Sequence, residues 1–261
     1  MKMQAKKLFL FLIPLFLFAC DDRHDQPPVF SFYISQEEEY PNLMRMMCDN
    51  FDVSVAERAL QYNIPYDIYK KIENCKDDDG ALKKFLAESY KDKYKAMHDV
   101  LSKLSRNGFS SDAEKLAKVF GYKIPKYRVR LDAHIGGTSN PGDGYVSLRY
   151  DQYDNQETND TTEFEHYLVW EVALAETWNH MDKMFADGKL PPVSADKRDY
   201  VFWGVSEMAA WMITEHSNEF HFKQHEIQYP TLRAHKDEAV KLWESKTGFD
   251  DWIIEMVKML K

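Results

Sequence analysis

The sequence predicts a mainly α-helical protein of the α+β class, a multi-helix body with a small antiparallel β element around residues 127–150. Two observations support this prediction. From about residue 36 apolar residues recur at helical spacing, as Leu43, Met47 and Phe51 do. Between residues 127 and 150 the period changes to the alternation of polar and apolar residues that is typical of strands.

The first nineteen residues have the composition of a secretory signal peptide. Three lysines, at positions 2, 6 and 7, precede an apolar run over residues 8–18 that is too short to span a membrane in the mature protein. The ending Leu17-Phe18-Ala19-Cys20 resembles the lipobox of bacterial lipoproteins. The resemblance implies that the chain is cleaved before Cys20 and that this cysteine carries the lipid. An ordinary cleaved signal peptide is the alternative.

The lipobox resemblance implies a location in the bacterial cell envelope, on the periplasmic or outer side of a membrane. Two or more acyl chains of the palmitate type suffice for stable attachment, since each buried CH₂ contributes about 0.8 kcal/mol. Asp21 and Asp22 resemble the inner-membrane retention signal of enteric bacteria, while other bacteria use acidic residues there for surface export. The choice between the inner and the outer membrane therefore stays open.

The charge balance excludes a nucleic-acid partner. The chain carries 43 acidic against 34 basic residues, a formal net charge of −9, and gains nothing from counterion release on a phosphate backbone. Anionic headgroups repel such a chain as well, so the lipid would hold it at the membrane. We expect a protein partner in the envelope.

Two cysteines remain once Cys20 is assigned to the lipid. Cys48 and Cys75 form an even pair in an exported protein, which indicates a disulfide. Closing a loop of about 28 residues would contribute roughly 3–4 kcal/mol to stability. Two buried free thiols are the alternative, and no Cys/His cluster indicates a metal site at these residues.

Three segments follow the signal peptide. Residues 20–35 are expected to be the lipidated cysteine and a tether, residues 36–121 a helical module, and residues 122–261 an α+β module. The expected helices of the first module cover about 36–51, 54–62, 66–75, 81–104 and 111–120.

The second module is expected to begin with two strands. Residues 127–133 and 145–150 alternate, and the glycine-rich turn between them predicts an antiparallel pair. That turn lacks the spacing of a phosphate-binding loop and leads into a strand. Long helices follow over 162–185 and 194–216, then two amphipathic helices after residue 229.

Two acidic residues lie in strongly apolar helices. Glu171 falls among Leu168, Val172 and Ala175, and Glu207 falls in a run that is apolar nearly all round. Burying an ionised carboxylate without a partner is costly, so the two acids would meet across the core, line a cleft, or be satisfied locally.

The strand pair, its glycine-rich turn and the two helices that follow resemble the core of zincin metallopeptidases over residues 127–216. In that family one helix carries HExxH and a later helix supplies a glutamate as third ligand. The window Trp170-Glu171-Val172-Ala173-Leu174 keeps only the glutamate. The resemblance implies a degenerate relative, with Glu171 at the general-base position and Glu207 at the third-ligand position. Zinc binding needs the two missing imidazoles, so neither a metal nor another cofactor is expected.

Other acid and histidine groupings indicate surface contacts. Glu176 and His180 lie at i, i+4, on what the pattern predicts to be the polar side of their helix, where a surface contact is preferred and a metal held with a third ligand from elsewhere is the alternative. The histidines at positions 216, 221, 225 and 235 match no ligand spacing. The preferred function is therefore non-catalytic binding in the envelope, as a pseudoenzyme or an inhibitor- or immunity-type protein. The alternative is a hydrolase of peptide or cell-wall substrates that uses Glu171 and Glu207 as catalytic residues.

Overall fold

A computed structural model describes residues 29–48, 55–72, 74–140, 142–152, 161–220, 222, 227 and 229–261. The described chain is mainly helical with a small mixed sheet, which confirms the predicted mainly α, α+β class. Among these residues no helix combines the length and hydrophobicity that crossing a membrane requires. The expected signal peptide and lipidated Cys20 lie outside them.

The helices agree with the periodicity of the sequence except after residue 229, where a short helix, α8, precedes the two that were expected. They are α1 (Gln36–Cys48), α2 (Val55–Gln61), α3 (Tyr66–Ile72), α4 (Ala81–Asn107), α5 (Ser110–Phe120), α6 (Thr162–Ala186), α7 (Ala195–His216), α8 (Pro230–Arg233), α9 (Lys236–Ser245) and α10 (Phe249–Leu260). The strands are β1 (Phe30–Ile34), β2 (Tyr127–Asp132), β3 (Gly137–Asn140) and β4 (Tyr145–Arg149), and a 3₁₀ turn over Tyr150–Gln152 follows β4.

The expected antiparallel pairing of the two main strands is wrong. The sheet has the order β1-β2-β4-β3, and β2 runs parallel to β4, with Val129 opposite Val146. The reason lies in the glycine-rich segment, which contains β3 as well as a turn. After β2 the chain crosses to the far side of β4 and runs antiparallel to it as β3. It then turns through Gly142 and Gly144, both at positive φ, and enters β4. The antiparallel pair is the β3–β4 hairpin.

The expected tether over residues 20–35 does not extend to residue 35. Residues 30–34 form β1, which pairs in parallel with β2, Phe30 opposite Tyr127 and Ile34 opposite Leu131. The alternating side chains of Phe30 and Phe32 explain this, because both lie on the sheet face that is packed against the core.

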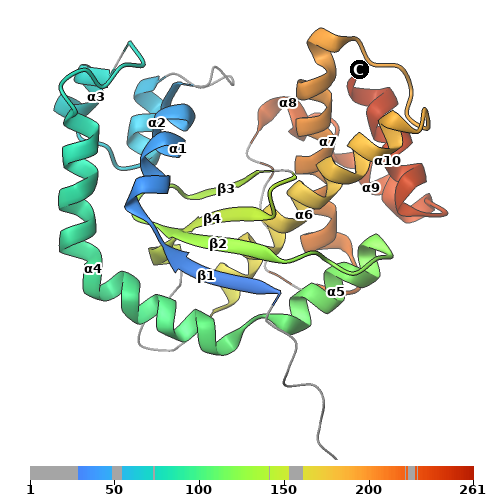
Figure 1. Cartoon of the computed structure of the whole chain (residues 1–261). Helices are drawn as coiled ribbons and strands as arrows, with labels where there is room; N and C mark the ends of the chain where they lie inside the picture. The colour runs from blue at the N-terminus through green and yellow to red at the C-terminus, as the bar shows by residue number, and fades with distance from the viewer. Residues whose placement is uncertain are drawn as a thin grey trace, which may run out of the picture.

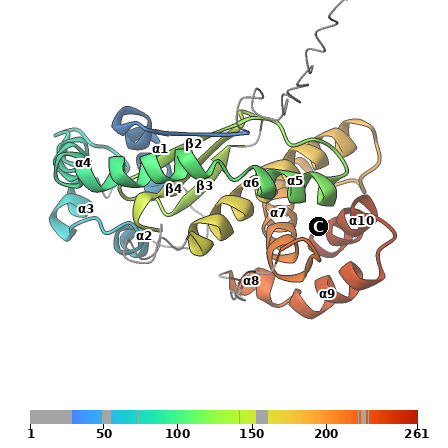
Figure 2. The same cartoon turned by 90° about the horizontal axis from the view of Figure 1, so that it is seen from below.

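The sheet lies between two groups of helices (Figure 1), with α1–α3 on one side and α7–α10 on the other. Seen from below (Figure 2), α4 and α5 run across the strands. One hydrophobic cluster joins Val100 and Leu104 of α4 to Val129 of β2 and to Phe164 and Leu168 of α6. The two modules expected on either side of residues 121 and 122 therefore share one hydrophobic core.

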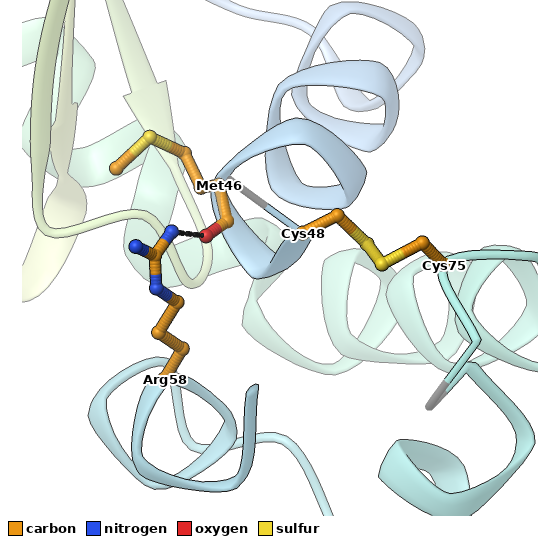
Figure 3. The surroundings of a disulfide bond; sticks show 4 residues. All are labelled: Met46, Cys48, Arg58 and Cys75. Carbon is orange, nitrogen blue, oxygen red and sulfur yellow. Dashed lines mark hydrogen bonds between the residues drawn. A yellow bond between two sulfur atoms is a disulfide. The ribbon is translucent and has the colours of Figure 1, made fainter. Parts of the chain in front are cut away.

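The predicted disulfide is present. Cys48, at the end of α1, is bonded to Cys75 beyond α3, with the two Cα atoms 5.6 Å apart. Figure 3 shows Arg58 of α2 beside it, donating to the backbone carbonyl of Met46. The bond and the arginine thus connect α1 to the segments that follow it.

Candidate functional site

The two acids singled out in the sequence lie together where β3, α6 and α7 meet. Glu171 is buried in the middle of α6 and faces β3. A Cβ atom added to Gly137 would lie 2.7 Å from the Glu171 Oε1 atom, closer than real Cβ contacts come. The strand therefore approaches the carboxyl at a distance that only glycine allows.

Glu207 reaches the same place from α7. The Trp170 indole Nε1 donates a hydrogen bond to the Glu207 Oε2 atom at 3.2 Å, and Trp203 also hydrogen-bonds this carboxylate. Both tryptophans pack against the hydrophobic cluster that is formed mainly by α7 and α10. The carboxylate is therefore held by two indole donors, one from each of the two long helices.

Burial sets the proton affinity of both acids. Burial and, to a lesser extent, the negative charge of Glu207 raise the pKa of Glu171 to about 8, and the hydrogen bond with Ser139 of β3 opposes the rise. Burial likewise raises the pKa of Glu207 to about 7, against the two indole hydrogen bonds, which favour the charged form. Near neutral pH the Glu171 carboxyl therefore holds a proton.

Tyr229, just before α8, lies beside the two acids. Burial raises the pKa of its hydroxyl, and the negative charges of Glu207 and Glu171 raise it further, while the positive charge of Arg58 lowers it. Its ring packs edge-on against Trp203, with the centroids 4.6 Å apart. Trp203 and Tyr229 thus form aromatic walls of the site, and Arg58 of α2 lies near enough to act on it.

The arrangement can exchange a proton or bind a polar group, but it has no imidazole at the positions that zinc would require. Trp170 is bound to Glu207, and Leu174 is packed against the core. No group of three or more His, Cys, Asp or Glu side chains capable of holding a metal occurs in the described part of the chain.

The expected surface position of Glu176 is wrong. Glu176 is buried and accepts hydrogen bonds from the hydroxyls of Tyr122, at 2.8 Å, and Tyr127. Tyr127 belongs to β2, whose core-facing side chains reach α6. The folded sheet therefore helps to supply the hydrogen-bond donors of the buried Glu176 carboxylate. His180 instead contacts Asp250 of α10, with Nε2 and Oδ1 2.6 Å apart.

The structure describes two of the four scattered histidines, and neither belongs to a group of three or more potential metal ligands within the described residues. The ring of His216 packs against Trp211, with the centroids 4.6 Å apart. His235 directly precedes α9, and its backbone carbonyl accepts from the amide of Ala239. His221 and the histidine at position 225 lie outside the described residues.

Sequence reasoning missed a second buried cluster, on the other face of the sheet. Glu39 of α1 is fully buried and accepts from the backbone amides of Ala133 and His134, at 2.9 and 2.8 Å. Arg130 and Asp132 form a buried two-point ion pair on β2, and burial together with the charge of Glu39 raises the pKa of Asp132 to about 8.

The signal for this cluster was the position of its members. Glu39 lies on the same helical face as Leu43 and Met47, and Arg130 and Asp132 alternate on one face of their strand. The cluster ties α1 to the end of β2 and has the character of a structural network.

A comparison with known protein families, with curated proteins and with solved structures finds no match to the chain. The chemistry of the site itself therefore carries the functional argument.

Proposed function

We propose that this protein is a lipid-anchored component of the bacterial cell envelope that binds another protein and does not hydrolyse it. The hydrogen bond from Trp170 to Glu207 carries the proposal. Trp170 occupies the position of the first imidazole in the zincin-like pattern, and its indole satisfies the acid that would be the third metal ligand. The site is completed by the protein's own side chains.

The arrangement of the elements supports descent from such an enzyme. The antiparallel hairpin β3–β4 lies beside α6, Glu171 faces β3, and α7 brings a second acid to it. A fold of this kind can lose its metal ligands and keep its surface, because fold and function are separable. The proposed role is that of a pseudoenzyme whose surface has been retained for binding, either as an accessory or as an inhibitor- or immunity-type protein.

A hydrolase is the second candidate, and one observation favours it. The pKa values of Glu171 and Glu207, about 8 and about 7, lie where a general acid and a general base operate best near neutral pH. Under this alternative the two carboxyls would act on a peptide or cell-wall bond without a metal held by the window 170–174.

The test compares wild type with the Glu171→Gln, Glu207→Gln double variant. Each full-length protein is purified from detergent-solubilised envelopes of the source bacterium and assayed for co-purifying proteins and for turnover of casein and of purified peptidoglycan. The proposal expects one stoichiometric partner in both preparations and no turnover in either. Turnover by wild type that the double variant lacks would establish the hydrolase instead.

A further inference from the structure

The strand β1 forms one edge of the sheet, and among the described residues half of its backbone groups face no partner strand. The Tyr127 amide donates to the carbonyl of Val29 at 2.8 Å, in the register that puts Phe30 opposite Tyr127. Because alternate residues of a parallel strand point to the same side, the amides and carbonyls of Phe30, Phe32 and Ile34 point away from β2. The described part of the chain places no strand on that side.

A groove of about 580 Å³ runs along this edge, between β1 and α4. Phe32 and Ile34 contribute its floor from the strand, and Tyr90, Tyr94 and Leu101 contribute its wall from one side of α4. The Tyr94 side chain is 62% exposed and belongs to the large hydrophobic side chains that lie on the surface. The groove combines a row of free hydrogen-bonding groups with an apolar wall.

The charged side chain that lines the groove is a cation. Lys91 of α4 is exposed along it, and none of the lining residues is acidic. This differs from the chain as a whole, whose net charge is −9. The groove therefore favours a segment that carries carboxylates.

We propose that β1 and α4 form a docking site for an extended, acidic segment of a partner protein, which adds to the sheet as a further strand. The segment's backbone would pair with the outward groups of Phe30, Phe32 and Ile34. Every second side chain would enter the groove beside Tyr94, and a carboxylate would lie near Lys91. This inference rests on the proposed binding function and names the surface and the chemistry of the partner.

A randomised dodecapeptide phage library selected against the purified full-length protein supplies the probe. We expect the enriched peptides to alternate apolar with polar residues and to contain an acidic residue. A fluorescein-labelled copy of the most enriched peptide should lose about tenfold or more in affinity on Tyr94→Ala and on Lys91→Glu. The matched controls Tyr66→Ala, at a 71% exposed tyrosine of α3, and Lys83→Glu, at an exposed lysine of α4, should leave its affinity unchanged.

Backbone pairing is tested on the peptide, which avoids substitutions in β1 that would disturb folding. Methylating the amide nitrogens of every second residue removes the donors of one peptide edge. One of the two methylated registers should abolish binding and the other should leave it intact. Equal effects of both registers would contradict strand addition.

Three results overturn the inference: no enriched peptide, enriched peptides that are insensitive to Tyr94→Ala, or a dimer of the chain that Tyr94→Ala dissociates. The proposed binding function is judged separately. If the partner that co-purifies from envelopes stays bound to the Tyr94→Ala and Lys91→Glu variants, the docking site is wrong while the binding function stands.

Discussion

The Trp170 indole donates to the Glu207 carboxylate at 3.2 Å, and this contact joins α6 to α7 where Glu171 and Glu207 enter the apolar interior between them. A tryptophan is a donor only, so it stabilises a carboxylate and cannot replace a metal-binding imidazole. The contact explains how the chain keeps Glu207 inside an otherwise apolar helix.

Glu171→Gln should raise the free energy of unfolding at pH 8.5, by an amount on the order of 1–3 kcal/mol. Burial raises the pKa of Glu171 from 4.5 to about 8, so the native state binds the proton more tightly than the unfolded state does. Stability from this residue is therefore fully present below pH 4.5 and falls as the pH rises toward 8. Glutamine resembles the protonated acid and removes that fall.

Urea denaturation of both proteins between pH 5 and 9 measures the effect. The difference between variant and wild type isolates Glu171 from Asp132 and Glu207, which titrate in the same range. Glu88→Gln, at an exposed helical position, is the control and should change little. A variant that is less stable than wild type at pH 8.5 would show that the Glu171 charge is needed in the fold.

Gly137→Ala should destabilise the protein by about 1–3 kcal/mol, because the new methyl group would meet the buried Glu171 carboxyl at 2.7 Å. In a Glu171→Ala background the same change should cost much less, since the obstructing atoms are gone. A double-mutant cycle followed by thermal unfolding measures the coupling. Additive effects would mean that the strand and the carboxyl do not touch.

Removing the disulfide with Cys48→Ala and Cys75→Ala should lower the free energy of unfolding by roughly 3–4 kcal/mol, because the bond closes a loop of 27 residues in the unfolded chain. Guanidinium denaturation of the double variant measures the loss. Wild type treated with a reductant serves as the matched comparison and should unfold at nearly the same midpoint. Two titratable thiols in denatured, unreduced wild type would contradict the disulfide.

Cys20→Ser should abolish incorporation of labelled palmitate and leave the signal peptide uncleaved by the lipoprotein pathway. Labelling in cells, followed by separation of membranes from soluble protein, checks both points. Cys48→Ser is the control for loss of a cysteine elsewhere and should leave lipid incorporation unchanged. A Cys20→Ser protein that is processed normally and still fractionates with membranes would show that the lipobox resemblance is misleading.

Much of the helical framework could be predicted because its signals are local. The periodicity of residues 81–104 and 111–120 indicated α4 and α5 to within a few residues, and the even cysteine count indicated the bond between Cys48 and Cys75. Glu171 and Glu207 were found because each interrupts an apolar helical face. Such features depend on neighbours within one or two turns.

The features that were missed depend on residues far apart in the chain. The direction of β2 relative to β4 depends on where the glycine-rich segment passes, which alternation does not encode. The periodicity of α6 predicts a surface position for Glu176, but this helix is buried on more than one side. The tyrosine partners of Glu176 come from the β2 region. Glu39 is satisfied by amides more than ninety positions away.

The zinc content of the purified full-length protein decides between a non-catalytic binding protein and a zinc hydrolase. Wild type, Glu207→Gln and Glu171→Gln are each dialysed against zinc, washed, and measured by elemental analysis. Because Trp170 holds Glu207 and Leu174 offers no ligand, all three should retain the same amount of zinc, and wild type should show no zinc-dependent hydrolysis. One zinc per chain in wild type, lost in Glu207→Gln together with hydrolytic activity, would contradict a non-catalytic binding protein.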